Sequence, residues 1–447
     1  MLLVIDWGSI GIKTLQFILS FSLLVTLHEM GHFFTARWFK CRVEKFYLFF
    51  NPWFSLWKKK IGETEYGIGW VPFGGYVKIS GMVDESMDKE QMKLPPQPYE
   101  FRSKPAWQRL IIMIGGVVVN VLLAIVIFIG IMWVWGDEYI PVSNLKYGVY
   151  ADSLGKKIGV QDGDKIVAVA GKPIEKVGTA GSEIIMNEAK EITVERNGQR
   201  LNIPLPEGFI TQLNKNKLGG FTYIRIPLVV DSVLKDAKIS KGTIAKGDTL
   251  IGIDTKQIQY STDLQNYEGP KNKSALLTFK RGNDTVTADV FFDEKGSNRL
   301  FFQSPNKILG STKTDYTLMQ AIPAGFNRCW ETLNKYIQNL GLLFTSKEVK
   351  VSDSLGSILS IGNTFPGVWD WQSFWTLTGI FSIILAFMNI LPIPALDGGH
   401  ALFTIVEMIS GRKPSDKFME YAQMVGMVLL LGLMAYAMGL DFWRAFK

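Results

Sequence analysis

The hydrophobic residues of this chain gather in four long stretches separated by polar sequence. About 20 consecutive apolar residues are enough for a helix to cross the hydrocarbon core of a bilayer. We therefore predict four membrane-spanning helices. The first stretch begins near residue 10 and includes His28, and the others cover residues 110–135, 374–396 and 421–440.

Basic residues near the ends of these stretches predict their orientation, because lysine and arginine resist transfer across the membrane. They crowd the connection between the first two stretches and the connection between the last two. We expect both connections to face the cytoplasm, which would place both termini and the long segment 136–370 outside. The basic residues concerned are Arg37, Lys40, Arg42, Lys45, Arg102, Lys104, Arg109, Arg412, Lys413 and Lys417.

The long outer segment contains an internal repeat. Residues 159–174 and 242–258 share one pattern, each with a Gly-Asp pair, at Gly163 and Gly247. Each copy is interpreted as a short helix, a Gly-Asp turn, a strand, a tight turn and a second strand. The pattern resembles the PDZ domain of bacterial envelope proteases. We expect two tandem modules of this kind, and PDZ domains bind peptide or protein segments by strand addition.

Residues 64–79 alternate in polarity and contain Gly74, Gly75 and Tyr76, which predicts a hairpin of extended strands rather than a helix. Aromatic residues surround this segment, and such rings settle at the headgroup level of a bilayer. A plain cytoplasmic hairpin with an aromatic core is the alternative. The aromatic residues are Trp53, Phe54, Trp57, Trp70, Phe73 and Tyr76.

These patterns predict a polytopic α-helical membrane protein with four transmembrane helices, a membrane-associated β-hairpin or sheet and two tandem β-rich PDZ domains. A polar loop is expected at residues 84–98. The predicted order is a first transmembrane helix at 1–40, a cytoplasmic-side, membrane-associated β-hairpin and loop at 41–105, a second helix at 106–136, PDZ domains at 140–210 and 222–295, an amphipathic helix and linker at 315–370, a third helix at 371–400, a cytoplasmic connection at 401–420 and a fourth helix with the tail at 421–447.

Composition supports this class of protein. Hydrophobic residues make up 47% of the 447 residues, which indicates membrane segments beside water-soluble ones. The net charge of +7 does not indicate nucleic-acid binding, because topology and anionic headgroups account for the basic residues. Cys41 and Cys329 fall on opposite sides of the predicted membrane, so we expect neither a disulfide nor a cysteine metal site.

The first apolar stretch carries a zinc-protease motif, His28-Glu29-Met30-Gly31-His32. Residues four apart share one face of a helix, so His28 and His32 can direct two imidazoles at one Zn²⁺. Glu29 can then reach a water molecule at the metal. Ionisable side chains at membrane depth cost roughly 2.5–3.5 kcal/mol each, and a bound metal would offset that cost.

A catalytic zinc site usually has three protein ligands, so a third is needed. The candidate is Asp397, the one acidic residue between positions 374 and 401. Nearby prolines break the helix and would let an extended segment turn this carboxylate inward. The alternative is an Asp397 that only caps the following helix, with Gly398 and Gly399 in the turn. The three histidines of the chain all fall in these two motifs, which favours the metal site.

These two motifs together resemble the site-2 protease family of intramembrane zinc metalloproteases. The likeness covers nearly the whole chain. It implies that His28, His32 and Asp397 bind Zn²⁺, that Glu29 is the catalytic base and that Asn389 holds the substrate near the metal. Further points of likeness are the Gly-Gly-Tyr-Val-Lys run at Gly74, the motif Phe101-x-x-Lys104-x-x-Trp107-Gln108-Arg109, the tandem PDZ pattern and Leu396-Asp397-Gly398-Gly399-His400.

Asn120 matches the asparagine of the family's Gly-Pro-x-x-Asn motif on the second span. Two positions depart from the family pattern: Val117 and Ser357 stand where the family has proline. We also expect the glycine-bearing strand at Gly74, Gly75 and Tyr76 to bind an unwound substrate by strand addition.

The resemblance implies an endopeptidase of the cell inner membrane that cleaves the transmembrane segments of single-span proteins, such as anti-sigma factors or remnant signal peptides. The PDZ pair would act as a size filter for substrates trimmed on the outer side. A non-catalytic zinc-containing PDZ scaffold is disfavoured, because a structural zinc site needs no general base at Glu29. A zinc transporter is disfavoured, because the other spans carry no acidic or histidine relay.

Overall fold

The computed structural model describes residues 6–82, 95–216, 220–265 and 267–445, and it divides into two compact units. The first comprises Met1–Gly136, Asp315–Leu340 and Leu355–Lys447, and the second comprises Asp137–Thr314 and Gly341–Ser354. Most of the polar loop predicted at 84–98 lies outside the described residues. The helices of the first unit are α1 (Trp7–Trp38), α3 (Ala106–Val134), α10 (Ile358–Gly362), α11 (Trp371–Ile390), α12 (Asp397–Ser410) and α13 (Asp416–Ala445), and α8 (Leu318–Thr345) begins there.

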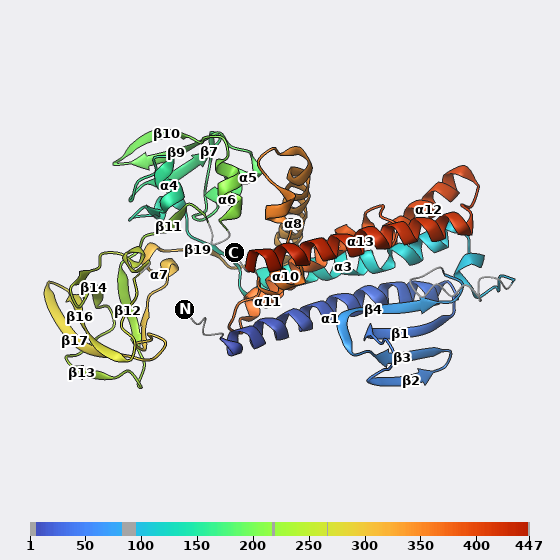
Figure 1. Ribbon diagram of the computed structural model, residues 1–447, viewed down its shortest axis with the longest axis horizontal. Helices are drawn as coiled ribbons and strands as arrows, with labels where there is room; N and C mark the ends of the chain where they lie inside the picture. Colours follow the sequence, from blue (N-terminus) through green and yellow to red (C-terminus); the bar gives the residue numbers. More distant parts are fainter. Residues whose placement is uncertain (1–5, 83–94, 217–219, 266, 446–447) are drawn as a thin grey trace. The chain divides into compact units, whose positions relative to one another are not determined.

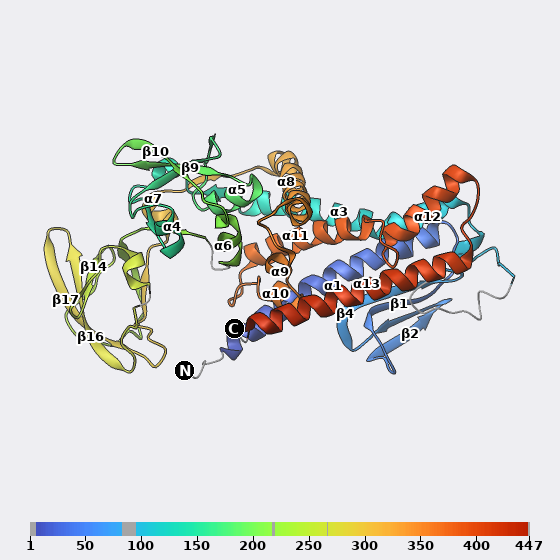
Figure 2. The ribbon, with the colours of Figure 1, turned by 45° about the horizontal axis from the view of Figure 1, so that its top comes forward.

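Among the described residues, four helices are long and apolar enough to cross a membrane, as predicted: α1, α3, α11 and most of α13. Helix α3 packs against α1, α11 and α12 (Figures 1 and 2). Glycines let α1 and α3 approach closely, because a Cβ atom on Gly115 would lie 2.7 Å from the carbonyl oxygen of Gly31. This crossing holds the His28–His32 turn of α1 against the middle of α3.

The third spanning helix is shorter than predicted. It ends at Ile390 rather than at Leu396, because the prolines at 392 and 394 cannot continue the helical hydrogen bonding. A second helix, α12, then starts at Asp397 and runs to Ser410, through part of the connection predicted at 401–420. The motif expected at the end of the third span therefore lies at the start of α12.

Four strands of the first unit form a sheet beside α1, in the order β2-β3-β1-β4. The prediction that residues 64–79 form a hairpin is wrong, because β1 lies between β3 and β4 and pairs parallel with β3 and antiparallel with β4. The hairpin is instead made by β2 and β3. Packing of β1 and β4 against α1 selects this order (Figure 1). The bounds are β1 Val43–Phe50, β2 Trp57–Ile61, β3 Thr64–Ile68 and β4 Val71–Ile79.

Ser357, which stands where the resembled family is expected to have proline, caps α10 and joins it to the end of α13. Its backbone N–H and its hydroxyl both donate to Asp441, at 2.9 and 2.6 Å, and Ser360 donates to the same oxygen at 2.6 Å. Arg444 bridges Asp441 and the carbonyl oxygen of Leu355. Proline at 357 could donate neither of the first two hydrogen bonds. The structure gives no comparable role to Val117, which is buried in α3.

The second unit contains two β-rich modules with separate hydrophobic cores. In the first, β10-β9-β7-β8 form one sheet and β6 pairs with β11. In the second, one sheet has the order β13-β17-β16-β14-β12-β18, and β15 pairs with β14. The bounds are β5 Asp137–Tyr139, β6 Val149–Ala151, α4 Ser153–Lys157, β7 Lys165–Val169, β8 Lys172–Pro173, α5 Ala180–Met186, β9 Glu191–Arg196, β10 Gln199–Pro204, α6 Phe209–Lys215, β11 Thr222–Ile224, β12 Leu228–Val233, β13 Ile239–Lys241, β14 Thr249–Ile253, β15 Lys256–Gln257, β16 Lys273–Arg281, β17 Asp284–Phe292, β18 Leu300–Phe302, α7 Pro305–Leu309, β19 Thr312–Thr314 and α9 Val351–Ser354.

The short helix predicted within each copy of the repeat is found in neither, because residues 159–164 and 242–248 form turns and irregular backbone. A helix, α4, ends just before the first copy, and there the Asp152 side chain accepts hydrogen bonds from the N–H groups of Leu154 and Gly155. A strand, β13, ends just before the second copy and pairs with β17. The prediction of a helix inside the copies is therefore wrong, and the two segments that precede the copies differ because sheet pairing makes one of them a strand.

The Gly-Asp turns of the two copies are built in the same way. Asp164 accepts two hydrogen bonds of 2.8 Å from Arg196, and Asp248 accepts bonds of 2.7 and 2.6 Å from Arg281. Hydrogen bonding to Arg281 holds the pKa of Asp248 below its ordinary value. The equivalent ion pairs support the internal repeat that the sequence indicates.

Candidate metal centre

Helix α1 presents His28 and His32 on one face, one turn apart, and both side chains are buried. Their Nε2 atoms lie 3.2 Å apart. The turn is fixed from the other side by α3, because His32 Nδ1 lies 2.8 Å from the carbonyl oxygen of Ile112. A carbonyl oxygen can only accept, so Nδ1 carries the proton and Nε2 presents its lone pair to the site.

Asp397 enters the same site from the first turn of α12. The preceding residues are tightly folded: Ala395 has a φ of +87°, and a Cβ atom on Gly399 would lie 2.6 Å from the carbonyl oxygen of Ile393. Asp397 Oδ2 lies 3.1 Å from His28 Nε2 and 3.3 Å from His32 Nε2. The carboxylate thus points to the two imidazoles, and Leu396, not Asp397, occupies the N-cap position of α12.

The three atoms form a nearly equilateral triangle with sides of 3.1, 3.2 and 3.3 Å. Ligand atoms about 2.0–2.2 Å from a tetrahedral zinc ion lie about 3.3 Å apart, so the triangle has the size of three zinc ligands. Asp397 Oδ2 is buried and accepts no hydrogen bond in acceptable geometry from any residue that the structure describes. A shared cation would satisfy this oxygen, and the donor set therefore fits Zn²⁺.

Two asparagines contact His28 from neighbouring helices. Asn120 of α3 is fully buried, and its amide lies 3.2 Å from His28 Nδ1. With the amide oxygen toward the ring, Nδ1–H would donate to it and leave Nε2 free for a metal. The Asn389 amide of α11 lies 3.2 Å from His28 Nε2, so this side chain faces the metal position itself. The structure therefore brings both predicted asparagines to the site.

Gly116 is a site residue that the sequence argument did not single out for a role. A Cβ atom there would lie 2.5 Å from His32 Nε2 and 2.6 Å from His28 Cε1. The signal available in the sequence was the pair Gly115-Gly116 in the middle of an apolar span. Because Gly116 has no side chain, the two imidazoles can lie against the backbone of α3.

Glu29 opens onto a cleft of about 340 Å³ between α1, the sheet edge and the start of α12. Val77 of β4 lines the cleft together with Glu29. Gly75 and Tyr76 line the same cleft, whereas Gly74 packs against the ring of Phe50. The other residues of the lining are His32, Phe50, Ile79, Met82, Met113, Ala395, Leu396, Asp397, His400 and Gln423.

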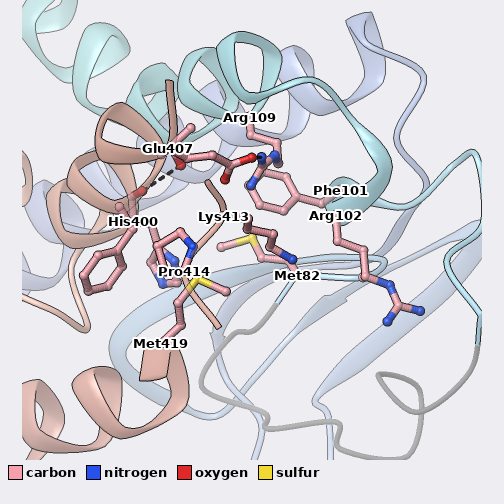
Figure 3. A pocket seen from close by; sticks show the side chains of 12 residues that line it. Met82, Phe101, Arg102, Arg109, His400, Glu407, Lys413, Pro414 and Met419 are labelled. Atoms are coloured by element: carbon pink, nitrogen blue, oxygen red, sulfur yellow. Dashed lines mark hydrogen bonds and ion pairs between the residues drawn. The ribbon is translucent and has the colours of Figure 1, made fainter. Parts of the chain in front are cut away.

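An ion pair anchors α12, and with it Asp397, to α3. Arg109 Nη2 lies 2.5 Å from Glu407 Oε1, and Arg109 Nε donates to the carbonyl oxygen of Lys104 at 3.0 Å. Figure 3 shows this pair in a small cavity beside His400, the third histidine of the chain. The ion pair gives a structural role to Arg109, the last residue of the motif that spans the start of α3.

Comparison with known proteins agrees with this geometry. A family model described as peptidase family M50 matches residues 16–433. The chain is 28% identical over 461 residues to "Putative zinc metalloprotease NMA0084" of Neisseria meningitidis, and the match covers 96% of this chain and 98% of the relative. It is 26% identical over 459 residues to the regulator of sigma-E protease RseP of Escherichia coli, with 96% and 98% covered.

The apolar helices, the His-His-Asp site and the family match together define an integral-membrane metalloprotease. More particularly, the chain belongs to peptidase family M50, the site-2 protease family, and is a zinc metalloendopeptidase.

Proposed function

We propose that this protein cleaves the transmembrane segments of single-span membrane proteins, of the anti-sigma-factor or remnant-signal-peptide type, in regulated intramembrane proteolysis. His28, His32 and Asp397 would hold the zinc ion. The observation that carries this proposal is the 3.1–3.3 Å triangle of their ligand atoms, buried within the membrane-spanning unit. We also place the protein in the cell inner membrane, with the site toward the cytoplasmic side and the second unit and both termini outside.

A zinc ion held by His28, His32 and Asp397 would supply a Lewis acid that can activate water and polarise a carbonyl group. Glu29, at the cleft beside these ligands, would accept a proton from the attacking water on its carboxylate and pass it to the leaving amine. Asn389, which faces the metal position, would hold the substrate carbonyl by donating a hydrogen bond from its amide. Asn120 would orient the His28 ring through Nδ1.

The substrate helix must unwind before its amides can be attacked, and β4 offers an edge to receive the extended chain. Within the described residues β4 pairs only with β1, which leaves its other edge facing the cleft. Gly75 and Tyr76 would bind the substrate there by strand addition, with Gly74 shaping the strand.

The decisive experiment replaces Glu29 with glutamine in the purified full-length protein and supplies a model transmembrane substrate. We expect one zinc per chain to be retained and cleavage to fall by about 100-fold or more, because a general base contributes roughly 10²–10⁴-fold. Glu63→Gln, at an exposed turn of the sheet, is the matched control and should cleave normally. Full activity of Glu29→Gln would reject the assignment.

We further propose that the two β-rich modules are PDZ domains that filter substrates by size. They would admit membrane proteins whose outer domain has already been trimmed by another protease. The repeated Gly-Asp turns with their ion pairs, Asp164 with Arg196 and Asp248 with Arg281, support the tandem arrangement on which this proposal rests.

A further inference from the structure

The edge strand β2 carries a row of lysines with no role in the site described above. Its sequence is Trp57-Lys58-Lys59-Lys60-Ile61, and all five residues are exposed. None of the three lysines forms an ion pair with a residue that the structure describes. Glu65, which lies opposite Lys60 in β3, accepts a hydrogen bond of 2.7 Å from the Tyr47 hydroxyl. Three positive charges therefore stand together at the outer edge of the sheet.

The registers of the sheet relate this edge to the depth of α1. Trp57 is in line with Ile68, Leu48 and Gly75 across the four strands. A Cβ atom on Gly75 would lie 3.1 Å from Val25, so this row of the sheet is level with Val25 of α1. Val25 precedes the end of α1 by 13 residues, or about 20 Å of helix, and lies in a stretch with no acidic or basic residue between Lys13 and His28. Trp57 is thus level with the apolar part of a helix that is long and apolar enough to cross a membrane.

The next rows lead toward the C-terminal end of α1. The row of Lys59 contains Tyr66 and Phe46, and both rings contact Phe33 of α1, with centroid distances of 6.1 and 5.6 Å. Beyond the Trp57 row, at the opposite end, the loops expose large apolar side chains. These are Trp53 (90% exposed), Phe54 (56%), Leu56 (64%) and Trp70 (38%).

We propose that Lys58, Lys59 and Lys60 bind the phosphate groups of anionic phospholipids in the leaflet at the C-terminal end of α1. The apolar loops would lie among the acyl chains, and the flexible lysine stems would carry their charges out to headgroup level. Each lysine near an anionic surface favours binding by about fivefold. An acidic protein partner fits less well, because the adjoining loops expose large apolar side chains next to a row that is level with the apolar part of α1.

This contact would set the depth of the sheet in the membrane. The sheet is continuous from β2 to β4, and β4 carries Gly75 and Tyr76 at the cleft. Anionic lipid would thereby hold the predicted substrate-binding edge level with Glu29. The lipid contact itself does not depend on the proposed catalytic roles and can be measured without substrate.

The test measures which lipids the full-length protein retains. Protein is reconstituted in equal amounts of phosphatidylcholine and phosphatidylglycerol, extracted in mild detergent and examined by native mass spectrometry. The main variant is Lys58→Gln/Lys59→Gln/Lys60→Gln. The control, Lys271→Gln/Lys273→Gln/Lys280→Gln, removes three exposed lysines from the second unit and changes the net charge equally. A third variant replaces the β2 lysines with arginine.

We expect the wild-type protein to retain phosphatidylglycerol in preference to phosphatidylcholine, and the β2 glutamine variant to lose about fivefold or more of this preference. The arginine variant and the second-unit control should keep it. An unchanged preference in the β2 glutamine variant would overturn the proposal, and so would an equal loss in the control or in the arginine variant. Equal retention of both lipids by the wild-type protein would also overturn it.

Discussion

At the scale of single residues, the metal centre depends on backbone groups as much as on side chains. The carbonyl oxygen of Ile112 sets the tautomer of His32, and the missing side chain of Gly116 leaves room for both imidazoles. Polar groups that orient metal ligands commonly change metal affinity by 10–100-fold when they are lost. The site should therefore respond strongly to a single added methyl group.

Gly116→Ala should lower zinc affinity by about tenfold or more and reduce cleavage in parallel. The new Cβ atom would lie within 2.8 Å of three ring atoms of His28 and His32, two buried side chains that would have to shift from their positions at the site. Zinc titration of the purified protein measures the effect. Gly130→Ala is the control on the same helix, because nothing lies within 4 Å of its Cβ position. Equal zinc affinity in both variants would contradict this reading of the site.

The residues that could be proposed from the sequence were those with distinctive side chains. The four-residue spacing of His28 and His32 and the isolated acid at Asp397 both predicted ligands, and the structure brings their atoms within 3.3 Å. The carbonyl oxygen of Ile112 has no sequence signature, since every residue carries one. Its place at the site follows from how α3 crosses α1.

At the scale of elements, the alternation of polar and apolar residues located the strands but did not predict which strands pair. Residues 64–79 do form two strands, yet β1 separates them, because contact with α1 outweighs the short connection that would favour a hairpin. Likewise the prolines after Ile390 predicted a break, but the new helix that starts at Asp397 depends on its packing against α3. Strand pairing and helix packing join residues that are far apart in the sequence, so local sequence patterns do not predict them.

Strand addition at β4 predicts that the substrate contacts the β4 edge of the sheet and not the β2 edge. A photo-crosslinking residue at Tyr76, in a Glu29→Gln background that retains substrate, should crosslink to the transmembrane segment of the substrate. The same probe at Lys58, in the same row of the sheet but on the opposite edge strand, should not. Crosslinks of equal yield at both positions, or at neither, would rule out β4 as the substrate-binding edge.

At the scale of the whole molecule, we assign peptide hydrolysis to one unit and the selection of substrates to the other. The proposed zinc ligands and the cleft belong to the first unit, whereas the two β-rich modules form the second. Each of the two modules has its own hydrophobic core. We therefore expect that the second unit can be changed without loss of the zinc site. The size-filter proposal depends on this division of labour.

Deleting residues 145–295 should leave cleavage of a trimmed substrate within about threefold of the full-length rate, because the catalytic residues lie outside the deletion. The same deletion should permit cleavage of a substrate that keeps its folded outer domain, by at least about tenfold over the full-length protein. Parallel cleavage assays with the two substrates provide the measurement. Unchanged selection against the untrimmed substrate would refute the filter.

The central claim is that His28 and His32 from α1 and Asp397 from α12 hold one zinc ion within the membrane-spanning unit. X-ray absorption at the zinc edge of the purified Glu29→Gln protein tests it most directly. We predict one zinc per chain with two imidazole nitrogens at about 2.0–2.1 Å and a carboxylate oxygen at about 2.0–2.2 Å. Bound zinc without imidazole scattering, or a coordination shell unchanged by His28→Ala, would contradict the account.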